Sequence, residues 1–303
     1  MEHVVAARGL EKSYGRLKAL DGVDLAIAPG SISGLIGPNG AGKTTTLKAL
    51  LGLIDVRGEL AVAGRDPRAA RHRLMEEVCF IADVGILPGW MTSRQLLDHV
   101  AAVHFRFDRG RAEKLLATTD IPANKRIRAL SKGMVTQLHL SVVMAIDASL
   151  LVLDEPTLGL DIMYRKTFYD RLLNDYYDGR RTIVISTHQV EEIEHLLTHL
   201  LFIDKGRIVL DQSLQEMAEQ YVEVAVAPDE RERALALQPI HQRELLGQLV
   251  CLYDGVAKPQ LEALGETRTP AVADLFVAKL AGAKNAQART QTQTHKEGEN
   301  DES

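Results

Sequence analysis

The stretch from Gly37 to Thr44 reads Gly-Pro-Asn-Gly-Ala-Gly-Lys-Thr and decides the fold class of this chain. It matches the pattern G-x-x-x-x-G-K-[ST], in which glycines let backbone amides point at phosphate oxygens. A short apolar strand is predicted before it, at residues 31–36, and a helix-like apolar spacing follows Gly42. The helix amino terminus adds its positive dipole end to the same place. Strand, glycine loop and helix in this order indicate an α/β core that binds a nucleoside triphosphate.

Individual residues of the loop have predictable parts in holding phosphates. Lys43 supplies a point charge to the outer phosphates, and the hydroxyl of Thr44 is expected on Mg²⁺. The residues expected to surround the nucleotide are Asn39, Gly40, Ala41, Gly42, Lys43, Thr44 and Thr45. The loop therefore predicts ATP and Mg²⁺ as the bound groups.

Two carboxylates follow a second apolar segment. Residues 150–153 are Leu-Leu-Val-Leu, and Asp154 and Glu155 come directly after them. In open α/β sheets, ligands bind at the carboxyl ends of the strands. We expect Asp154 to hold Mg²⁺ directly or through water, which leaves Glu155 to polarise the attacking water. Alone, such a pair could form a solvated turn; beside the phosphate loop, the catalytic interpretation is favoured.

Composition limits the class of protein. The 303 residues are 46% hydrophobic and 25% charged, with a net charge of −5, so no broad basic field favours nucleic acid. Cys79 and Cys251 each lie in an apolar stretch and are interpreted as small buried hydrophobes in a cytoplasmic protein. The amino terminus does not resemble a secretory signal, and the richest apolar run, residues 138–153, is too short to span a membrane. Any membrane role must come through a partner.

The pattern of the chain predicts two domains and a tail. Residues 1–213 are expected to form the nucleotide-binding domain, with a helical insert at about 87–147. Residues 214–282 predict a small α+β accessory domain. From residue 283 the polar and acidic sequence is expected to be disordered, because it has little apolar surface to bury.

Further elements follow in the order found in ABC (ATP-binding cassette) ATPases, and over residues 1 to about 213 the chain resembles that family. Leu-Ser-Lys-Gly-Met, which contains Ser131 and Gly133, resembles the family's signature loop. Gly-Leu-Asp, ending at Asp161, resembles its D-loop, and Ser-Thr-His, ending at His188, resembles its switch histidine. Tyr14 stands where the family places an aromatic platform for adenine.

The resemblance implies a transport ATPase built on a P-loop (RecA-like) core with an antiparallel β subdomain and a helical subdomain. Glu155 would act as the base and His188 would contact the γ-phosphate. Ser131, Gly133 and Asp161 would act in trans, because the family builds each site from two cassettes. The implied partners are a second ATP-binding subunit, identical or different, and a membrane permease that would hold the chain at the inner face of the cell membrane. The segment from Ile86 to Trp90 is the expected permease contact, although Trp90 could equally pack inside the helical insert.

Two positions depart from the family pattern. Lys132 replaces the usual first glycine of the signature, and Asp83 stands where the family carries a glutamine. Asp83 could contact Mg²⁺ or be a simple loop acid, since a carboxylate cannot donate as an amide can. Both changes, together with the appended domain, resemble exporter-type bacterial subunits with a separate permease.

Two other functions stay open at this level. A non-transport ABC ATPase of the translation or DNA-repair type is disfavoured, because the chain has one cassette and no long coiled-coil insertion. A regulatory module without catalysis would explain Lys132 and Asp83 but not why Lys43, Asp154, Glu155 and His188 all remain. The accessory domain shows no metal or nucleophile pattern, and it could stabilise a dimer or contact the partner.

Overall fold

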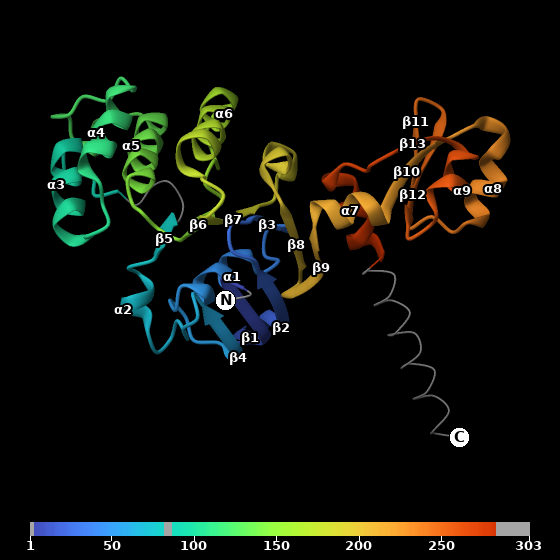
Figure 1. Ribbon diagram of the computed structural model, residues 1–303, viewed down its shortest axis with the longest axis horizontal. Helices are drawn as coiled ribbons and strands as arrows, with labels where there is room; N and C mark the ends of the chain where they lie inside the picture. The colour runs from blue at the N-terminus through green and yellow to red at the C-terminus, as the bar shows by residue number, and fades with distance from the viewer. Residues whose placement is uncertain (1–2, 82–86, 283–303) are drawn as a thin grey trace. The chain divides into compact units, whose positions relative to one another are not determined.

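The computed structural model describes residues 3–81 and 87–282 (Figure 1). The chain divides into two compact units, Met1–Ile208 and Val209–Ser303. The domain limits expected at residues 213 and 282 stay predictions. In the described ranges, no helix has both the length and the apolar composition needed to cross a membrane.

The main sheet of the first unit has six strands, of which the last, β9, continues past Ile208. Its strand order is β5-β6-β7-β3-β8-β9, and the pairs that join β5, β6, β7, β3 and β8 are parallel. The strands are β3 (Ile32–Ile36), β5 (Val78–Ile81), β6 (Leu150–Asp154), β7 (Thr182–Thr187), β8 (His199–Asp204) and β9 (Arg207–Ser213). Every residue of β3, β6 and β7 is buried, as expected of parallel strands covered on both faces. Their carboxyl ends therefore meet at one edge of the sheet.

A second, antiparallel sheet forms the β subdomain of this unit. Its order is β2-β1-β4, built from β1 (Val5–Tyr14), β2 (Leu17–Ile27) and β4 (Arg57–Val62). Side chains from this sheet, from α1 (Lys43–Leu50) and from the six-stranded sheet share one hydrophobic core. The short helix α2 (Arg71–Leu74) precedes β5. The predicted antiparallel subdomain is present, and its core holds α1 against the main sheet.

Helices between β5 and β6 make the helical subdomain. They are α3 (Ser93–Val103), α4 (Arg109–Ala117) and α5 (Lys132–Met144), and all three fall within the insert expected at about 87–147. Figure 1 shows the three side by side, and they pack on a separate core that includes Leu96, Leu138 and Val142. Thr92 and Gln95 form a capping box at the start of α3, and Asp108 caps α4. After β6 come α6 (Ile162–Arg171) and a π-helical turn (Leu172–Tyr176).

The second unit is a four-stranded antiparallel sheet with the order β11-β12-β10-β13. Its elements are α7 (Leu214–Gln220), β10 (Tyr221–Val226), α8 (Arg231–Ala236), β11 (His241–Leu245), β12 (Gln248–Asp254), α9 (Lys258–Glu262), β13 (Gly265–Arg268) and a helix at 272–282. From β10 to β13 the succession is β-α-β-β-α-β, the ferredoxin-like arrangement. The predicted small α+β unit is present.

Both faces of this sheet are covered. Side chains of Val222 and Val224 on β10 share one core with Leu261 and Ala234 from the two short helices, and the buried Cys251 joins them. Alternate residues of β10 face the other way, where Arg243 bridges from Glu223 to Asp274 on the helix at 272–282.

Candidate active site

The phosphate loop joins β3 to α1 with a tightly packed backbone. Gly40 and Gly42 have φ angles of 82° and 113°, in the left-handed region that glycine tolerates. A Cβ at Gly37 would lie 2.4 Å from the carbonyl oxygen of Ile203, and a Cβ at Gly42 would lie 2.6 Å from that of Ala19. Larger residues at these positions would displace the loop. The sequence pattern is thus required by the geometry.

Lys43 is the buried cation at the first turn of α1, with 5% of its surface exposed. Its Nζ donates to the carbonyl oxygens of Gly37 at 2.7 Å and Pro38 at 3.3 Å. The same Nζ lies 3.2 Å from Oε1 of Glu155. The ammonium group therefore sits between the loop and the carboxylate that the sequence predicts as the base.

Asp154 and Glu155 lie at the carboxyl end of β6, beside β7. The hydroxyl of Ser186, which is on β7, donates to Oδ1 of Asp154 at 2.6 Å. The backbone N–H of Glu155 lies 3.2 Å from the Ser186 carbonyl oxygen and 3.1 Å from its hydroxyl oxygen. Ser186 thereby fixes both acidic residues against the neighbouring strand.

Glu155 also contacts the predicted switch histidine. Nδ1 of His188 lies 2.9 Å from Oε2 of Glu155, while Lys43 approaches Oε1. The backbone of Glu155 has a φ of 47°, which costs energy for a residue with a side chain and is typical of functional positions. The structure thus brings Lys43, Asp154, Glu155 and His188 together, with one carboxylate between two basic groups.

The predicted signature and D-loop lie at the starts of neighbouring helices. Ser131 caps α5 by accepting from the N–H of Met134 at 3.2 Å, and Asp161 caps α6 by accepting from Tyr164 at 3.1 Å. A Cβ at Gly133 would lie 3.1 Å from the ring of Tyr164, so the two helices approach closely there. Lys132 extends onto the D-loop, because a Cβ at Gly159 would lie 2.2 Å from its Nζ. Lys132, which replaces the usual glycine of the signature, therefore lies beside the D-loop of its own chain.

The remaining predicted nucleotide contacts differ in their exposure. Tyr14 ends β1 with 49% of its surface exposed, and Lys12 lies 5.4 Å from its ring centroid. Asn39, Gly40 and Thr44 are exposed, Thr45 is partly buried and Ala41 is buried. The parts of Tyr14 in adenine binding and of Thr44 and Thr45 in phosphate binding stay predictions.

Thr44 at the start of α1 and Asp154 at the end of β6 are the kind of donors that a magnesium ion needs. The Thr44 hydroxyl and the Asp154 carboxylate are hard oxygen donors, which Mg²⁺ prefers. No group of three His, Cys, Asp or Glu side chains that could hold a metal occurs within residues 3–81 and 87–282. Mg²⁺ usually retains several water ligands and also coordinates phosphate oxygens of the nucleotide. Two protein donors are therefore sufficient. Asp83 lies outside the described residues, and its contact with the metal stays a prediction.

The sequence did not predict two features of the site. Ser186 was recognised only as a neighbour of His188, although its hydroxyl holds Asp154. Arg165 on α6 pairs with Glu192 in the turn η3 (Val190–Glu192) that follows His188. Serine in a strand and an ion pair between distant segments leave no periodic signal, so only the fold reveals them.

Comparisons with known proteins agree with this geometry. The family model described as "ABC transporter" matches residues 20–158. The Nod factor export ATP-binding protein I of Cupriavidus metallidurans is 33% identical over 282 residues, which cover 87% of this chain and 90% of that protein. The daunorubicin resistance ATP-binding protein DrrA3 of Streptomyces coeruleorubidus is 32% identical over 219 residues, covering 70% and 69%.

Solved structures share the fold. An ATP-binding subunit of an ABC transporter superposes with a TM-score of 0.64 at 23% identity, covering 71% of this chain and 92% of that one. A dimeric ATP-binding cassette in a post-hydrolysis state, bound to ADP and phosphate, gives a TM-score of 0.60 at 21% identity, covering 69% and 98%. At these identities the likeness concerns the fold.

Proposed function

The chain belongs to the ABC transporter family as its ATP-hydrolysing subunit, and we propose that it powers export through a separate membrane permease. The observation that carries ATP hydrolysis is the convergence of Lys43, Glu155 and His188 at the end of β6. Export is supported by the relatives, since one is named for Nod factor export and matches nearly the whole chain.

In this proposal each residue of the site has a separate part in ATP binding or hydrolysis. Amides of the phosphate loop and Lys43 hold the phosphates of ATP, because buried donors aimed at an anion stabilise its developing charge. Bound Mg²⁺, held by Thr44 and Asp154, would neutralise phosphate charge. Glu155 accepts the proton of the attacking water, and His188 contacts the γ-phosphate.

Release of the Lys43 contact is part of this assignment. The ammonium group now lies 3.2 Å from Glu155, and the two groups neutralise one another. When the phosphates of ATP take the lysine, the Glu155 carboxylate is left free to accept a proton. The same pair of residues thus links binding of the nucleotide to readiness of the base.

Subunits of this kind form dimers and work with a permease. We propose a head-to-tail dimer in which Ser131, Gly133 and Asp161 of one copy complete the site that holds ATP on the other. The apolar side chains beside the D-loop fit an interface between copies, since Ile162 is 80% exposed and Met163 is 74% exposed. Mixing two variants of this chain tests whether the second copy is identical.

Permease docking is proposed on the helical subdomain. Trp90 is 67% exposed, which favours a contact role over packing inside the subdomain. Phe105, after α3, is 72% exposed. Of the segment expected to make this contact, Ile86 to Trp90, Ile86 lies outside the described residues.

A mixing experiment tests the composite site. Lys43→Ala removes the phosphate lysine, and Ser131→Ala removes the signature hydroxyl, so each purified variant is expected to hydrolyse little ATP. A dimer of one copy of each has one intact site, and the mixture should therefore regain activity that neither variant has. If the mixture stays inactive while the unmodified chain is active, the head-to-tail homodimer is wrong.

Coupling to transport needs a second measurement. The chain is purified together with a candidate polytopic membrane protein, sought among the products of the neighbouring genes, and placed in lipid vesicles. ATP hydrolysis should rise in vesicles that contain this protein, and the rise should disappear with Trp90→Ala. An activity indifferent to the membrane protein would contradict the transport function and favour a non-transport ATPase.

A further inference from the structure

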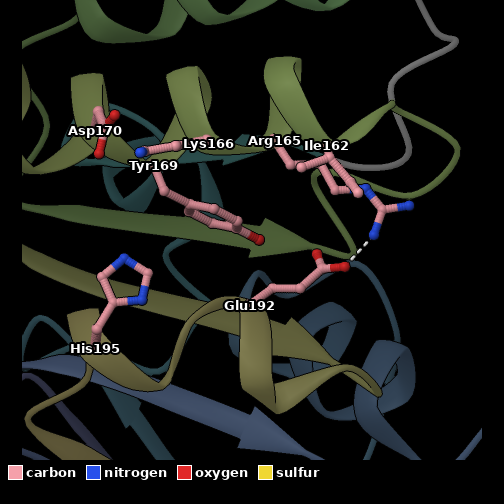
Figure 2. A pocket seen from close by; sticks show the side chains of 7 residues that line it. All are labelled: Ile162, Arg165, Lys166, Tyr169, Asp170, Glu192 and His195. Carbon is pink, nitrogen blue, oxygen red and sulfur yellow. Dashed lines mark hydrogen bonds and ion pairs between the residues drawn. The ribbon is translucent and has the colours of Figure 1, made fainter.

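Arg165 makes an unusual set of contacts one turn into α6. Its Nε donates to the carbonyl oxygen of Leu160 at 2.7 Å, and its Nη1 donates to the side-chain oxygen of Gln189 at 3.1 Å. The same Nη1 pairs with the carboxylate of Glu192. Figure 2 shows this ion pair beside a cavity of about 260 Å³ between α6 and the segment after β7. One guanidinium thus joins two segments that are far apart in the sequence.

Glu192 extends the connection to a third segment. Its Oε2 lies 3.5 Å from the hydroxyl of Thr157, and that hydroxyl lies 3.1 Å from the hydroxyl of Tyr169 on α6. Thr157 and Tyr169 are buried, and burial raises the pKa of the Tyr169 phenol. We call Arg165 and Glu192, with these contacts, the Arg165–Glu192 bracket.

Each segment held by the bracket carries one residue of the proposed chemistry. Thr157 is two residues after Glu155, Leu160 directly precedes Asp161, and Gln189 directly follows His188. The side chains of Arg165 and Glu192 are only 24% and 25% exposed, so the ion pair is shielded from much of the solvent. The bracket itself does not touch Lys43 or the phosphate loop by any contact found in the described residues.

We propose that Arg165 and Glu192 are positioning residues for hydrolysis, holding His188 and Asp161 in register with Glu155. This inference rests on the proposed ATPase function. Arginine suits the task because its planar fork can donate to a carbonyl, an amide and a carboxylate at once. A catalytic group displaced by about 1 Å can lose on the order of 100-fold in rate. The bracket therefore acts on turnover, whereas binding of ATP depends on the phosphate loop.

Three variants distinguish the charge of the Arg165–Glu192 ion pair from the planar hydrogen-bonding geometry of the Arg165 guanidinium. Arg165→Ala removes every contact, Arg165→Lys keeps the charge opposite Glu192 but loses the fork, and Glu192→Gln keeps the shape without the charge. Arg180→Ala is the matched control, since Arg180 also pairs with an acid, Asp178, but its side chain is 89% exposed and lies at a loop. Turnover, ATP affinity and the thermal midpoint are measured for the full chain.

Arg165→Ala is expected to lower kcat by roughly tenfold or more, with ATP affinity and thermal midpoint close to those of the parent. Arg165→Lys should recover part of kcat, and Arg180→Ala should match the parent. A kcat equal to the parent's overturns the inference. A fall that tracks an equal loss of ATP affinity or thermal midpoint also overturns it, because the role would then be structural only.

Hydrogen exchange without nucleotide tests the bracket independently of hydrolysis. In Arg165→Ala the amides of residues 157–161 and 187–192 should exchange faster than in the parent, while those of the phosphate loop should not. Unchanged exchange in both segments overturns the bracket. An unmodified chain that hydrolyses no ATP would instead contradict the proposed function, and the exchange result would still decide the bracket.

Discussion

Asp154 in the first unit and Glu223 in the second are both buried carboxylates on β-strands, with 9% and 3% of their surface exposed. Asp154 ends β6 at the open edge of a parallel sheet, and a neutral hydroxyl is its hydrogen-bond partner. Glu223 lies within β10, where Arg268 donates to it at 2.6 Å and Arg243 at 3.2 Å. A buried acid at a strand end is available for chemistry, whereas one enclosed by two guanidinium groups is already neutralised.

Non-glycine residues with positive φ occur in both units. Glu155 and Leu246 are both non-glycine residues with positive φ, 47° and 51°. The first carries the proposed base, and the second is a fully exposed turn residue between β11 and β12. The strain at Glu155 lies at the proposed site, whereas that at Leu246 belongs to a hairpin turn.

Asp154→Asn gives the largest expected effect. The amide keeps the size of the side chain but removes the charge expected to face Mg²⁺, so turnover should fall by about 100-fold or more. The free energy of unfolding should change little, because Ser186 can still donate to the amide oxygen. ATPase assays and chemical unfolding measure the two quantities. Normal turnover would remove Asp154 from the site.

Glu223→Gln is the matched change in the second unit, with the opposite expectation. Loss of the charged acceptor should lower the free energy of unfolding by about 2 kcal/mol, since hydrogen bonds to charged groups are worth roughly 1.5–3 kcal/mol. ATP turnover per folded molecule should stay close to that of the parent. Glu244→Gln, which alters an exposed pair with Arg231, is the control and should change neither. A loss of turnover per folded molecule in Glu223→Gln would contradict the purely structural role assigned to this carboxylate.

His139 predicts how the first unit responds to acid. Its Nδ1 is buried without a hydrogen-bond partner among the described residues, and burial lowers its pKa from 6.5 to about 4. In the unfolded chain the ring takes up a proton below pH 6.5, so stability falls as the pH drops from 6.5 toward 4. By pH 5 this loss is about 2 kcal/mol. Unfolding of His139→Leu should show a correspondingly weaker dependence on pH in that window, and an identical dependence would exclude His139 as the cause.

Leu246→Asn is expected to have the smallest effect and to stabilise the second unit. Leu246 and Gly247 form a two-residue turn with positive φ at both positions, for which Asn-Gly is preferred. Relief of the left-handed strain should raise the free energy of unfolding by about 1 kcal/mol. Thermal unfolding measures it, and Leu246→Val, which cannot relieve the strain, is the control. If Leu246→Asn also lowered turnover, the turn would have a function.

Much of the fold could be predicted because the central strands of the main sheet are short, almost wholly apolar segments. The apolar segments at 31–36 and 150–153 form β3 and β6, and the glycine loop lies between β3 and α1. The edge strands β11 and β13 were not recognised, because His-Gln-Arg-Glu-Leu and Gly-Glu-Thr-Arg lack apolar alternation. Edge strands expose polar residues, which makes them resemble loops in sequence.

The site divides in a similar way. Lys43, Asp154 and Glu155 were predicted from their places next to an apolar strand or a glycine loop, and His188 was predicted from the resemblance to ABC ATPases. The hydroxyl of Ser186 and the bracket of Arg165 and Glu192 depend on which strands and turns become neighbours. Such contacts join residues more than 25 positions apart, and no spacing rule encodes them.

Turnover and ATP affinity of Glu155→Gln test the central assignment most directly. The amide keeps the shape beside Lys43 and His188 but cannot accept the proton of the attacking water. We expect kcat to fall by about 100-fold or more while the dissociation constant for ATP stays close to that of the parent. Turnover close to the parent's, with ATP bound normally, would contradict the role of Glu155 as the base.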